Sequence, residues 1–321
     1  MSIPATVRLS SQTFAAQLAN SHRRLLQSDF YLGGQKLLDK VIWICDGRAD
    51  HLVVKGQNEQ EGAMEPSQCE LAMLSAIVRV DRNDFWLTSD AGYSKPSTVW
   101  SNLVDVKPSC VVCAPDLQPV KSDYAQVVAN LQELQNQMTT PGYQLGKGFY
   151  LPAQGDTRRF KLHHALFEVS VGPRAADTTL NLLIQPLDDE QETSGVSDEH
   201  SDFAMNDWPL THEETREELQ ALKATHRVVP VPAYDVIGNL IKPNAYRQSL
   251  QDAIVEMHFN MAHWAIAARR GKPANDVFVG DIEVIRVLVP PRPSSSGLAR
   301  KRVVHSHLDP NAPIQKKTRN A

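Results

Sequence analysis

Two stretches near the C-terminal end of the chain decide the fold. They are AIVEMHFNMAHW, residues 253–264, and VFVGDIEVIRVLV, residues 277–289. Apolar and polar residues alternate in the first stretch, which predicts a strand with one buried face because successive side chains of a strand point to opposite sides. The buried face is expected to carry Ala253, Val255, Met257, Phe259 and Met261. The opposite face carries Glu256, His258, Asn260 and Trp264.

A basic turn joins these two stretches. Arg269, Arg270 and Lys272 lie between them, so we expect a β-hairpin with an exposed basic tip. The alternation of the second stretch changes phase near Gly280 and Asp281, which predicts a β-bulge there.

The rest of the chain predicts several further parts. Residues 13–27 and 123–138 have apolar residues at helical spacing. Most of the short apolar runs favour strands, and residues 71–80 suit a strand or a helix. The runs expected to be strands are residues 41–45, 52–54, 85–87, 99–106, 160–171 and 179–184. The predicted organisation is an N-terminal arm over 1–29, an α+β domain over 30–187, an acidic linker over 188–210, a polar helix over 211–227, a β module over 228–290 and a basic tail over 291–321.

Charge is strongly separated along the sequence, although the net charge is only −4. Residues 188–218 hold twelve acidic residues and one basic residue, Arg216, which gives −11. Residues 290–321 hold seven basic residues and Asp309, which gives +6. Since like charges repel and few apolar residues are present, we expect a solvated linker and a disordered tail. The polar helix, with Leu219 and Leu222 as its anchors, is expected to pack weakly or to extend into solvent.

About sixty residues resemble known protein groups. The segments are Ala-Tyr-Asp-x-x-Gly-Asn-x-Ile at 233–241, Ala-Ile-Val-Glu-Met-His-Phe at 253–259 and Asp-Ile-Glu-Val-Ile-Arg-Val-Leu at 281–288. This order resembles uncharacterised proteins of mushroom-type fungi and, more faintly, the single-stranded DNA-binding proteins of some bacteriophages. The second resemblance implies an OB-fold barrel. The expected fold class is therefore α+β, mainly β, with a C-terminal OB-like barrel module and an N-terminal α+β domain.

Single-strand binding needs a rigid sheet face, rings on which bases stack, and cations along the phosphates. The residues predicted to supply rings and cations are Tyr246, His258, Trp264, Arg269, Arg270 and Lys272. The alternative is that Trp264 covers a sheet edge while the cations only keep the hairpin soluble. The expected partner is single-stranded DNA or RNA.

The tail suggests a nuclear protein. Its two basic clusters resemble a bipartite import signal that binds an import receptor. These clusters are Arg300, Lys301, Arg302 and Lys316, Lys317, Arg319. An inert solubilising terminus is the alternative. Residues 1–14 contain no apolar run of signal-peptide length and no 18 apolar residues follow one another, so secretion and membrane insertion are not expected.

No pattern of catalytic residues is apparent, and no metal or cofactor is expected. Cys110 and Cys113 form one CxxC pair without further zinc ligands at a recognised spacing, so burial in the core is the simpler interpretation. Asp281 and Glu283 could form a carboxylate pair, but no partner acid, base or phosphate-binding loop accompanies them. Two other hypotheses remain open at this point. One is a protein-interaction scaffold, and the other is an enzyme with an unfamiliar site in residues 30–187.

Overall fold

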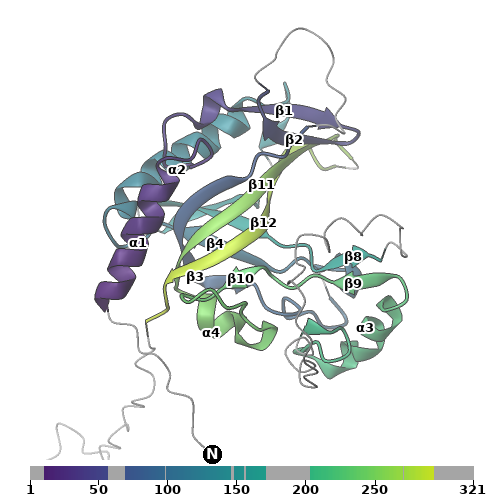
Figure 1. Cartoon of the computed structure of the whole chain (residues 1–321). Helices are drawn as coiled ribbons and strands as arrows, with labels where there is room; N and C mark the ends of the chain where they lie inside the picture. Colours follow the sequence, from purple (N-terminus) through teal and green to yellow (C-terminus); the bar gives the residue numbers. More distant parts are fainter. Residues whose placement is uncertain are drawn as a thin grey trace, which may run out of the picture. The chain divides into compact units, whose positions relative to one another are not determined.

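The predicted hairpin is the longest feature of the structure (Figure 1). Strands β11 (Ile254–Ile266) and β12 (Asn275–Val289) pair antiparallel from end to end. The five side chains predicted for the buried face are at most 1% exposed, which confirms that face. The register shifts at His258 and Phe259 and leaves Glu283 unopposed. The bulge predicted near Gly280 and Asp281 is therefore confirmed, and it lies at Glu283.

The computed structural model describes residues 11–56, 69–97, 99–145, 148–154, 157–170, 203–269 and 271–292. The α-helices are α1 (Ser11–Leu25), α2 (Val120–Asn136), α3 (Arg216–Leu222) and α4 (Tyr246–Leu250). Short 3-10 helices are η1 (Leu37–Asp39), η3 (Leu103–Asp105), η5 (Glu213–Thr215) and η6 (Pro243–Ala245). The remaining strands are β1 (Val41–Asp46), β2 (Ala49–Val54), β3 (Leu74–Trp86), β4 (Ser109–Cys113), β5 (Gln144–Leu145), β6 (Tyr150–Gln154), β7 (Thr157–His163), β8 (Phe167–Val169), β9 (His226–Val228) and β10 (Ala233–Tyr234). No described helix is long and apolar enough to cross a membrane.

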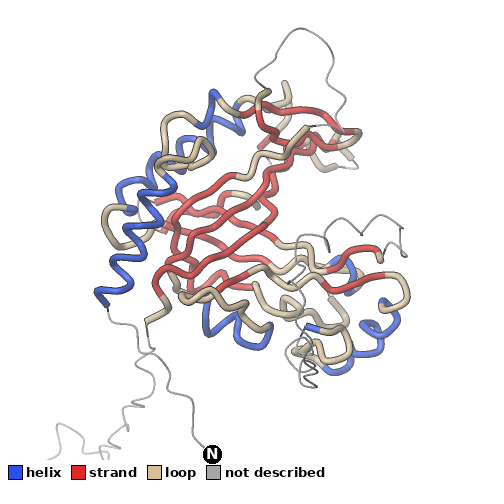
Figure 2. The backbone as a smooth tube through the Cα atoms, viewed as in Figure 1, coloured by secondary structure: helices blue, strands red, loops and turns tan. Residues whose placement is uncertain are grey.

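Five of these strands close into a barrel (Figure 2). β3 pairs with β4, β4 with β7, and β3 also pairs with β11, all antiparallel. The barrel closes where β7 runs parallel to β12, with His163 opposite Asp281. In chain order the strands therefore follow one another around the barrel as first, second, third, fifth and fourth, which is the Greek-key arrangement of the OB fold. The expected class, α+β and mainly β with an OB-like barrel, is confirmed.

The barrel is not contained in residues 228–290. β3, β4 and β7 come from the segment expected to be a separate domain, and Met1–Pro291 form one compact unit. The physical reason is that an isolated hairpin such as β11–β12 is at best marginally stable and needs further strands to cover its apolar face. Residues 30–187 supply those strands.

The other elements surround the barrel. α1 and α2 match the helices predicted at 13–27 and 123–138, and they lie along the same side of the sheet (Figure 1). Leu18 and Leu25 of α1 pack with Ile254 and Leu288 on the outside of the hairpin. β1 and β2 extend the sheet beyond β11.

The alternatives left open for residues 71–80 are decided in favour of a strand, because residues 74–80 lie in β3. One strand prediction needs correction. The strand predicted at 99–106 is instead a loop containing η3, because Leu103 and Val106 pack into a separate apolar cluster rather than into a sheet. The strand predicted at 179–184 lies outside the described residues.

Gly280 is required where the barrel closes. Its strand passes so near β7 that a Cβ at this position would collide with the Leu162 side chain and would lie 3.3 Å from Phe259. Leu162 and Phe259 are both fully buried in the barrel core. Only glycine lets β12 approach β7 this closely.

We predict that Gly280→Ala lowers the free energy of unfolding by about 1–3 kcal/mol, because overpacking a filled core displaces side chains and backbone. Chemical denaturation of the full chain measures this change. Gly56→Ala is the matched control, since a Cβ at Gly56 meets nothing within 4 Å. Equal stability of the Gly280→Ala protein and the parent would contradict the close approach.

Candidate nucleic-acid interface

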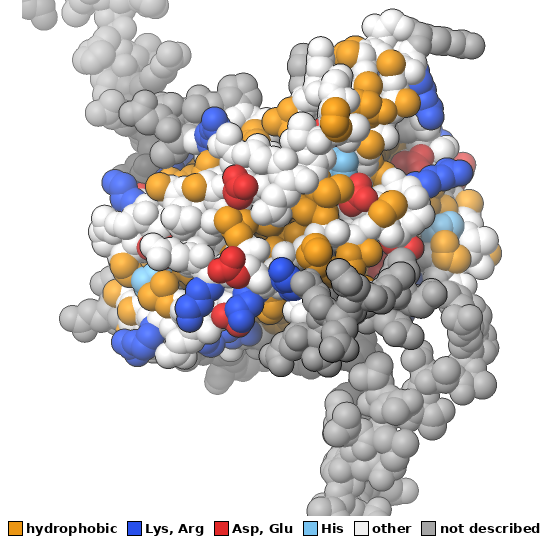
Figure 3. All heavy atoms as spheres, turned by 90° about the horizontal axis from the view of Figure 1, so that it is seen from above, with side chains coloured by type: hydrophobic (Ala, Val, Ile, Leu, Met, Phe, Trp, Pro, Cys, Tyr) orange, Lys and Arg blue, Asp and Glu red, His pale blue; other side chains and the backbone are white. Residues whose placement is uncertain are grey.

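Charge alone does not locate a site on this molecule. On the face seen from above, Lys and Arg side chains are interspersed with Asp and Glu around a middle region rich in hydrophobic side chains (Figure 3). A binding surface must therefore be sought through the barrel geometry.

The outer surface of β4 and β7 is the face on which OB folds bind oligonucleotides. Cys110, Val112, Phe160 and Leu162 of these two strands belong to the barrel core. Because side chains alternate along a strand, Lys161 and the residues at the other alternate positions point outward. The pairing places Ser109 opposite His163 and Val111 opposite Lys161 on this side of the sheet, where Ser109 and Val111 are buried and the two β7 side chains are half-buried.

A hollow of about 440 Å³ lies where the loop from β3 to β4 meets this surface. Trp86, Trp100, Lys107 and Lys161 are among the residues that line it. Trp86 is 54% exposed, Lys107 is exposed, and Trp100 and Lys161 are half-buried. The hollow thus combines two indole rings with two ammonium groups, which are the groups that stack on bases and attract phosphates.

The ring of Trp86 is held beside the loop backbone. Gly92 has a φ of +67°, and a Cβ there would lie 3.5 Å from Cζ3 of Trp86. The positive φ favours glycine at this position. The short distance shows that the Trp86 ring lies close to the loop at Gly92.

The loop itself is anchored by residues 203–225. The indole N–H of Trp208 donates to the Ser89 carbonyl at 2.8 Å, and Trp208 is fully buried. The Asp90 carboxylate accepts a hydrogen bond from the Thr211 hydroxyl at 2.8 Å. Trp208 lies within the segment expected to be a solvated linker, so that expectation does not hold for this residue.

Helix α3 provides a second anchor. The Glu218 carboxylate accepts from the Leu103 N–H at 2.7 Å and from the Lys95 ammonium at 2.9 Å. Burial raises the pKa of Glu218, but the Leu103 and Lys95 contacts outweigh it and hold the pKa below its usual value. Leu219 is fully buried in a cluster with Leu103. The expectation of a weakly packed helix is therefore wrong, because this helix supports the aromatic loop.

Lys107 and Lys161 place two positive charges at the hollow. Burial, together with the charges of Lys161 and Lys107, lowers the pKa of His163 to about 4. His163 is therefore neutral near pH 7. Lys161 forms no ion pair with any residue that the structure describes, so its charge can act on a ligand.

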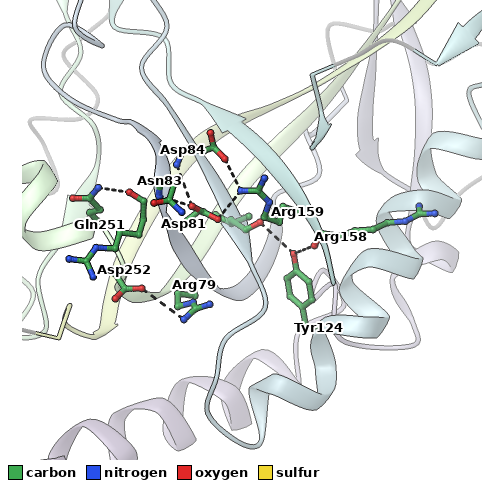
Figure 4. Close-up of polar contacts among 11 residues, drawn as sticks. Arg79, Asp81, Asn83, Asp84, Tyr124, Arg158, Arg159, Gln251 and Asp252 are labelled. Atoms are coloured by element: carbon green, nitrogen blue, oxygen red, sulfur yellow. Dashed lines mark hydrogen bonds and ion pairs between the residues drawn. The ribbon is translucent and has the colours of Figure 1, made fainter. Parts of the chain in front are cut away.

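Arg159, two residues before Lys161, has a structural role (Figure 4). Its guanidinium donates to Asp81 at 2.9 Å and to Asp84 at 2.7 Å. Burial raises the pKa of Asp81, but hydrogen bonds from the Asn83 N–H and from Arg159 outweigh it, and the pKa lies below its usual value. These contacts join β7 to the irregular part of β3, where the pairing with β4 shifts between Val80 and Phe85.

Two of the predicted binding residues, Tyr246 and His258, form hydrogen bonds within the protein. Tyr246 is fully buried, and its hydroxyl accepts a hydrogen bond from the Val231 N–H at 3.0 Å. Its prediction as a stacking ring is wrong, because the short helix α4 turns the ring into the core. Nε2 of His258 lies 2.7 Å from the Glu256 carboxylate, which also binds Arg24 of α1.

The other predicted residues lie at the hairpin tip. Trp264 is half-buried on the outer face of β11, while Arg269 and Lys272 are exposed and joined by two backbone hydrogen bonds. Arg270 and both basic clusters of the tail lie outside the described residues. Participation of these residues in binding stays a prediction.

Sequence reasoning missed the residues of the hollow. Trp86 and Trp100 were read as parts of apolar strands, and nothing in the local sequence pairs them with Lys107 or Lys161. The sequence feature that could have pointed to the hollow is the loop of residues 87–108, which is rich in Trp, Tyr, Ser and Gly and lies between two barrel strands. Its importance depends on recognising β3 and β4 as the first two strands. Cys110 and Cys113 are buried as predicted, and burial raises the pKa of Cys110 to about 12.

No protein-family model matches the chain and no curated protein matches it, so the resemblance to fungal proteins stays a sequence-based prediction. Among solved structures, the chain is similar to the single-stranded DNA-binding protein from bacteriophage Enc34 in complex with single-stranded DNA, with 8% identity and a TM-score of 0.33 over 75% of this chain and 98% of that one. A single-stranded DNA-binding protein encoded by bacteriophage T7 is also similar, with 7% identity and a TM-score of 0.28 over 70% and 94%. At these scores function has to be inferred from the residues of this chain.

We predict that Trp208→Ala loosens the loop of residues 87–108 before it affects the barrel, because the loop loses both an apolar contact and a hydrogen bond. Removing a buried Trp typically costs about 3–5 kcal/mol. Hydrogen–deuterium exchange should show faster exchange in the loop and unchanged protection in β11 and β12. Leu26→Ala, which removes an exposed side chain outside the loop, is the control. Unchanged exchange in the loop would show that Trp208 does not anchor it.

Proposed function

We propose that the chain binds single-stranded nucleic acid across the outer face of β4 and β7. One observation carries the proposal: a hollow with two indole rings and two lysines lies on the second and third strands of an OB-like barrel, beside the loop that joins its first two strands. That loop is one wall of the groove in OB folds.

The chemistry of the hollow fits a single strand better than a duplex. Bases of a single strand are free to stack on Trp86 and Trp100, and each stacked base contributes about 1–3 kcal/mol. In a duplex the base faces are covered by neighbouring bases. Lys107 and Lys161 would contact the phosphates, which makes the affinity depend on salt.

The hairpin tip supplies the second wall in this proposal. The loop between the fourth and fifth strands of an OB fold flanks the same groove, and Arg269 and Lys272 lie in the corresponding loop here. By the strand register, the outward positions His163, Asp281 and Asn260 lie side by side, and Ala262 is the next outward position along β11. Trp264 follows Ala262 on the outer face of β11. A strand crossing from the hollow would therefore reach the tip.

We predict that the full chain binds a fluorescent oligothymidylate and that Trp86→Ala weakens binding about 5-fold or more, from the loss of one stacked base. Lys161→Ala should reduce the slope of log affinity against log salt by about 0.7, the value for one phosphate of a single strand. Fluorescence anisotropy measures both effects.

Two controls match these variants. Leu26→Ala removes a side chain that is also 54% exposed, and Lys36→Ala removes an exposed cation outside the hollow. Both should bind like the parent protein. If the control variants lose as much affinity for the oligonucleotide as the hollow variants, this interface is ruled out. It is also ruled out if residues 291–321 alone account for the affinity.

We also propose that the basic clusters at 300–302 and 316–319 direct nuclear import, on the basis of their charge and spacing. A full-length fluorescent fusion, made too large for passive diffusion, should accumulate in nuclei. Changing Arg300, Lys301 and Arg302 to alanine should abolish that accumulation. Nuclear accumulation that persists without both clusters would contradict the proposal.

A further inference from the structure

Three polar side chains form a row beside the hollow. His163 of β7 lies opposite Asp281 of β12, and Asp281 lies opposite Asn260 of β11. Their sequence neighbours Leu162, Ile282 and Met261 belong to the barrel core, so the three side chains point outward. The row continues the face that carries Lys161.

Each member of the row has a shielded polar atom without a hydrogen-bond partner in the described part of the chain. These atoms are Nδ1 of His163, Oδ1 of Asp281 and Oδ1 of Asn260. Unpaired buried polar groups are rare in folded proteins because each one costs free energy. All three residues are partly exposed, so their side chains can turn toward a ligand on the outer face.

A neighbouring contact fixes which atom of the Asn260 amide donates and which accepts a hydrogen bond. Its amide Nδ2 donates to the Glu283 carboxylate at 2.7 Å, which leaves Oδ1 as an acceptor. The carboxylate oxygens of Asp281 accept hydrogen bonds, and neutral His163 can donate from Nδ1. Across the three strands the row therefore offers a donor, an acceptor and an acceptor.

This order complements one base edge. Guanine presents the O6 acceptor, the N1–H donor and the N2 amino donor in succession along its Watson–Crick edge. Thymine has a single donor between two acceptors, and adenine and cytosine each have one amino group beside a ring acceptor. A carboxylate can accept the adjacent N1–H and N2–H of guanine together, as in other bidentate contacts.

We propose that His163, Asp281 and Asn260 form a recognition site for guanine on the bound single strand. This inference rests on the proposed nucleic-acid binding and adds a base preference to it. In the complex Asp281 accepts from N1–H and N2–H, Asn260 accepts the second amino hydrogen, and His163 donates to O6. The lysines hold the flanking phosphates.

The test compares three oligonucleotides of equal length on the full chain. They are alternating thymidine–deoxyguanosine, the same sequence with deoxyinosine in place of deoxyguanosine, and oligothymidylate. Deoxyinosine keeps O6 and N1–H but lacks the N2 amino group, so it isolates that contact. Lithium salts prevent guanine quartets. We expect the guanine oligonucleotide to bind about tenfold more tightly than oligothymidylate, in the range of one bidentate base contact, with the inosine oligonucleotide between them.

Asp281→Asn should remove the guanine preference while oligothymidylate binding stays within about twofold, since a base contact contributes discrimination and the stacking and phosphate contacts remain. Asp39→Asn, which neutralises an exposed carboxylate elsewhere, should retain the preference. Thermal unfolding of both variants checks that they fold. If Asp281→Asn is destabilised, His163→Gln provides the same readout.

Equal affinity of the parent protein for all three oligonucleotides would overturn the guanine site and leave single-strand binding intact. Absence of binding to every oligonucleotide would overturn both. A preference that survives Asp281→Asn and His163→Gln would place guanine recognition elsewhere on the chain.

Discussion

The parallel contact between β7 and β12 is the constraint on which the rest of the structure depends. It joins residues more than a hundred positions apart in the sequence, with His163 opposite Asp281, and it turns an open sheet into a closed barrel. Gly280 permits the close approach, and the bulge at Glu283 follows directly after it. The same closure brings the outer faces of β7, β12 and β11 into one surface. The proposed path of a single strand exists only because this seam forms.

Two acidic residues have a structural role that their charge alone would not suggest. Asp90 and Glu218 each accept hydrogen bonds from groups far away in the chain, and Trp208 fills the space between the loop and its support. These contacts stabilise one conformation of the aromatic loop. A rigid loop loses less conformational entropy when a ligand binds. Asp90 and Glu218 therefore position the loop that lines the hollow.

The sequence predicted the hairpin, its buried face and the two long helices, since each depends on local periodicity. It also led to the correct fold class through a short resemblance. The domain boundaries could not be found in this way, because β3, β4 and β7 join the hairpin through long-range pairing that no local pattern records. Tyr246 looked like an available ring because the turn of α4 into the core depends on tertiary packing. Trp86 and Lys161 come together only through the long-range pairing of β3, β4 and β7, so the hollow had no sequence signature.

The most direct test of the central claim is to map where a bound strand lies. Photo-crosslinking the full chain to an oligonucleotide containing 4-thiothymidine, followed by mass spectrometry of the peptides, identifies the residues nearest the bases. The account predicts crosslinks in residues 86–109 and 157–163, with further crosslinks at the β11–β12 tip. Crosslinks confined to the α1 side of the barrel or to the C-terminal tail would contradict it.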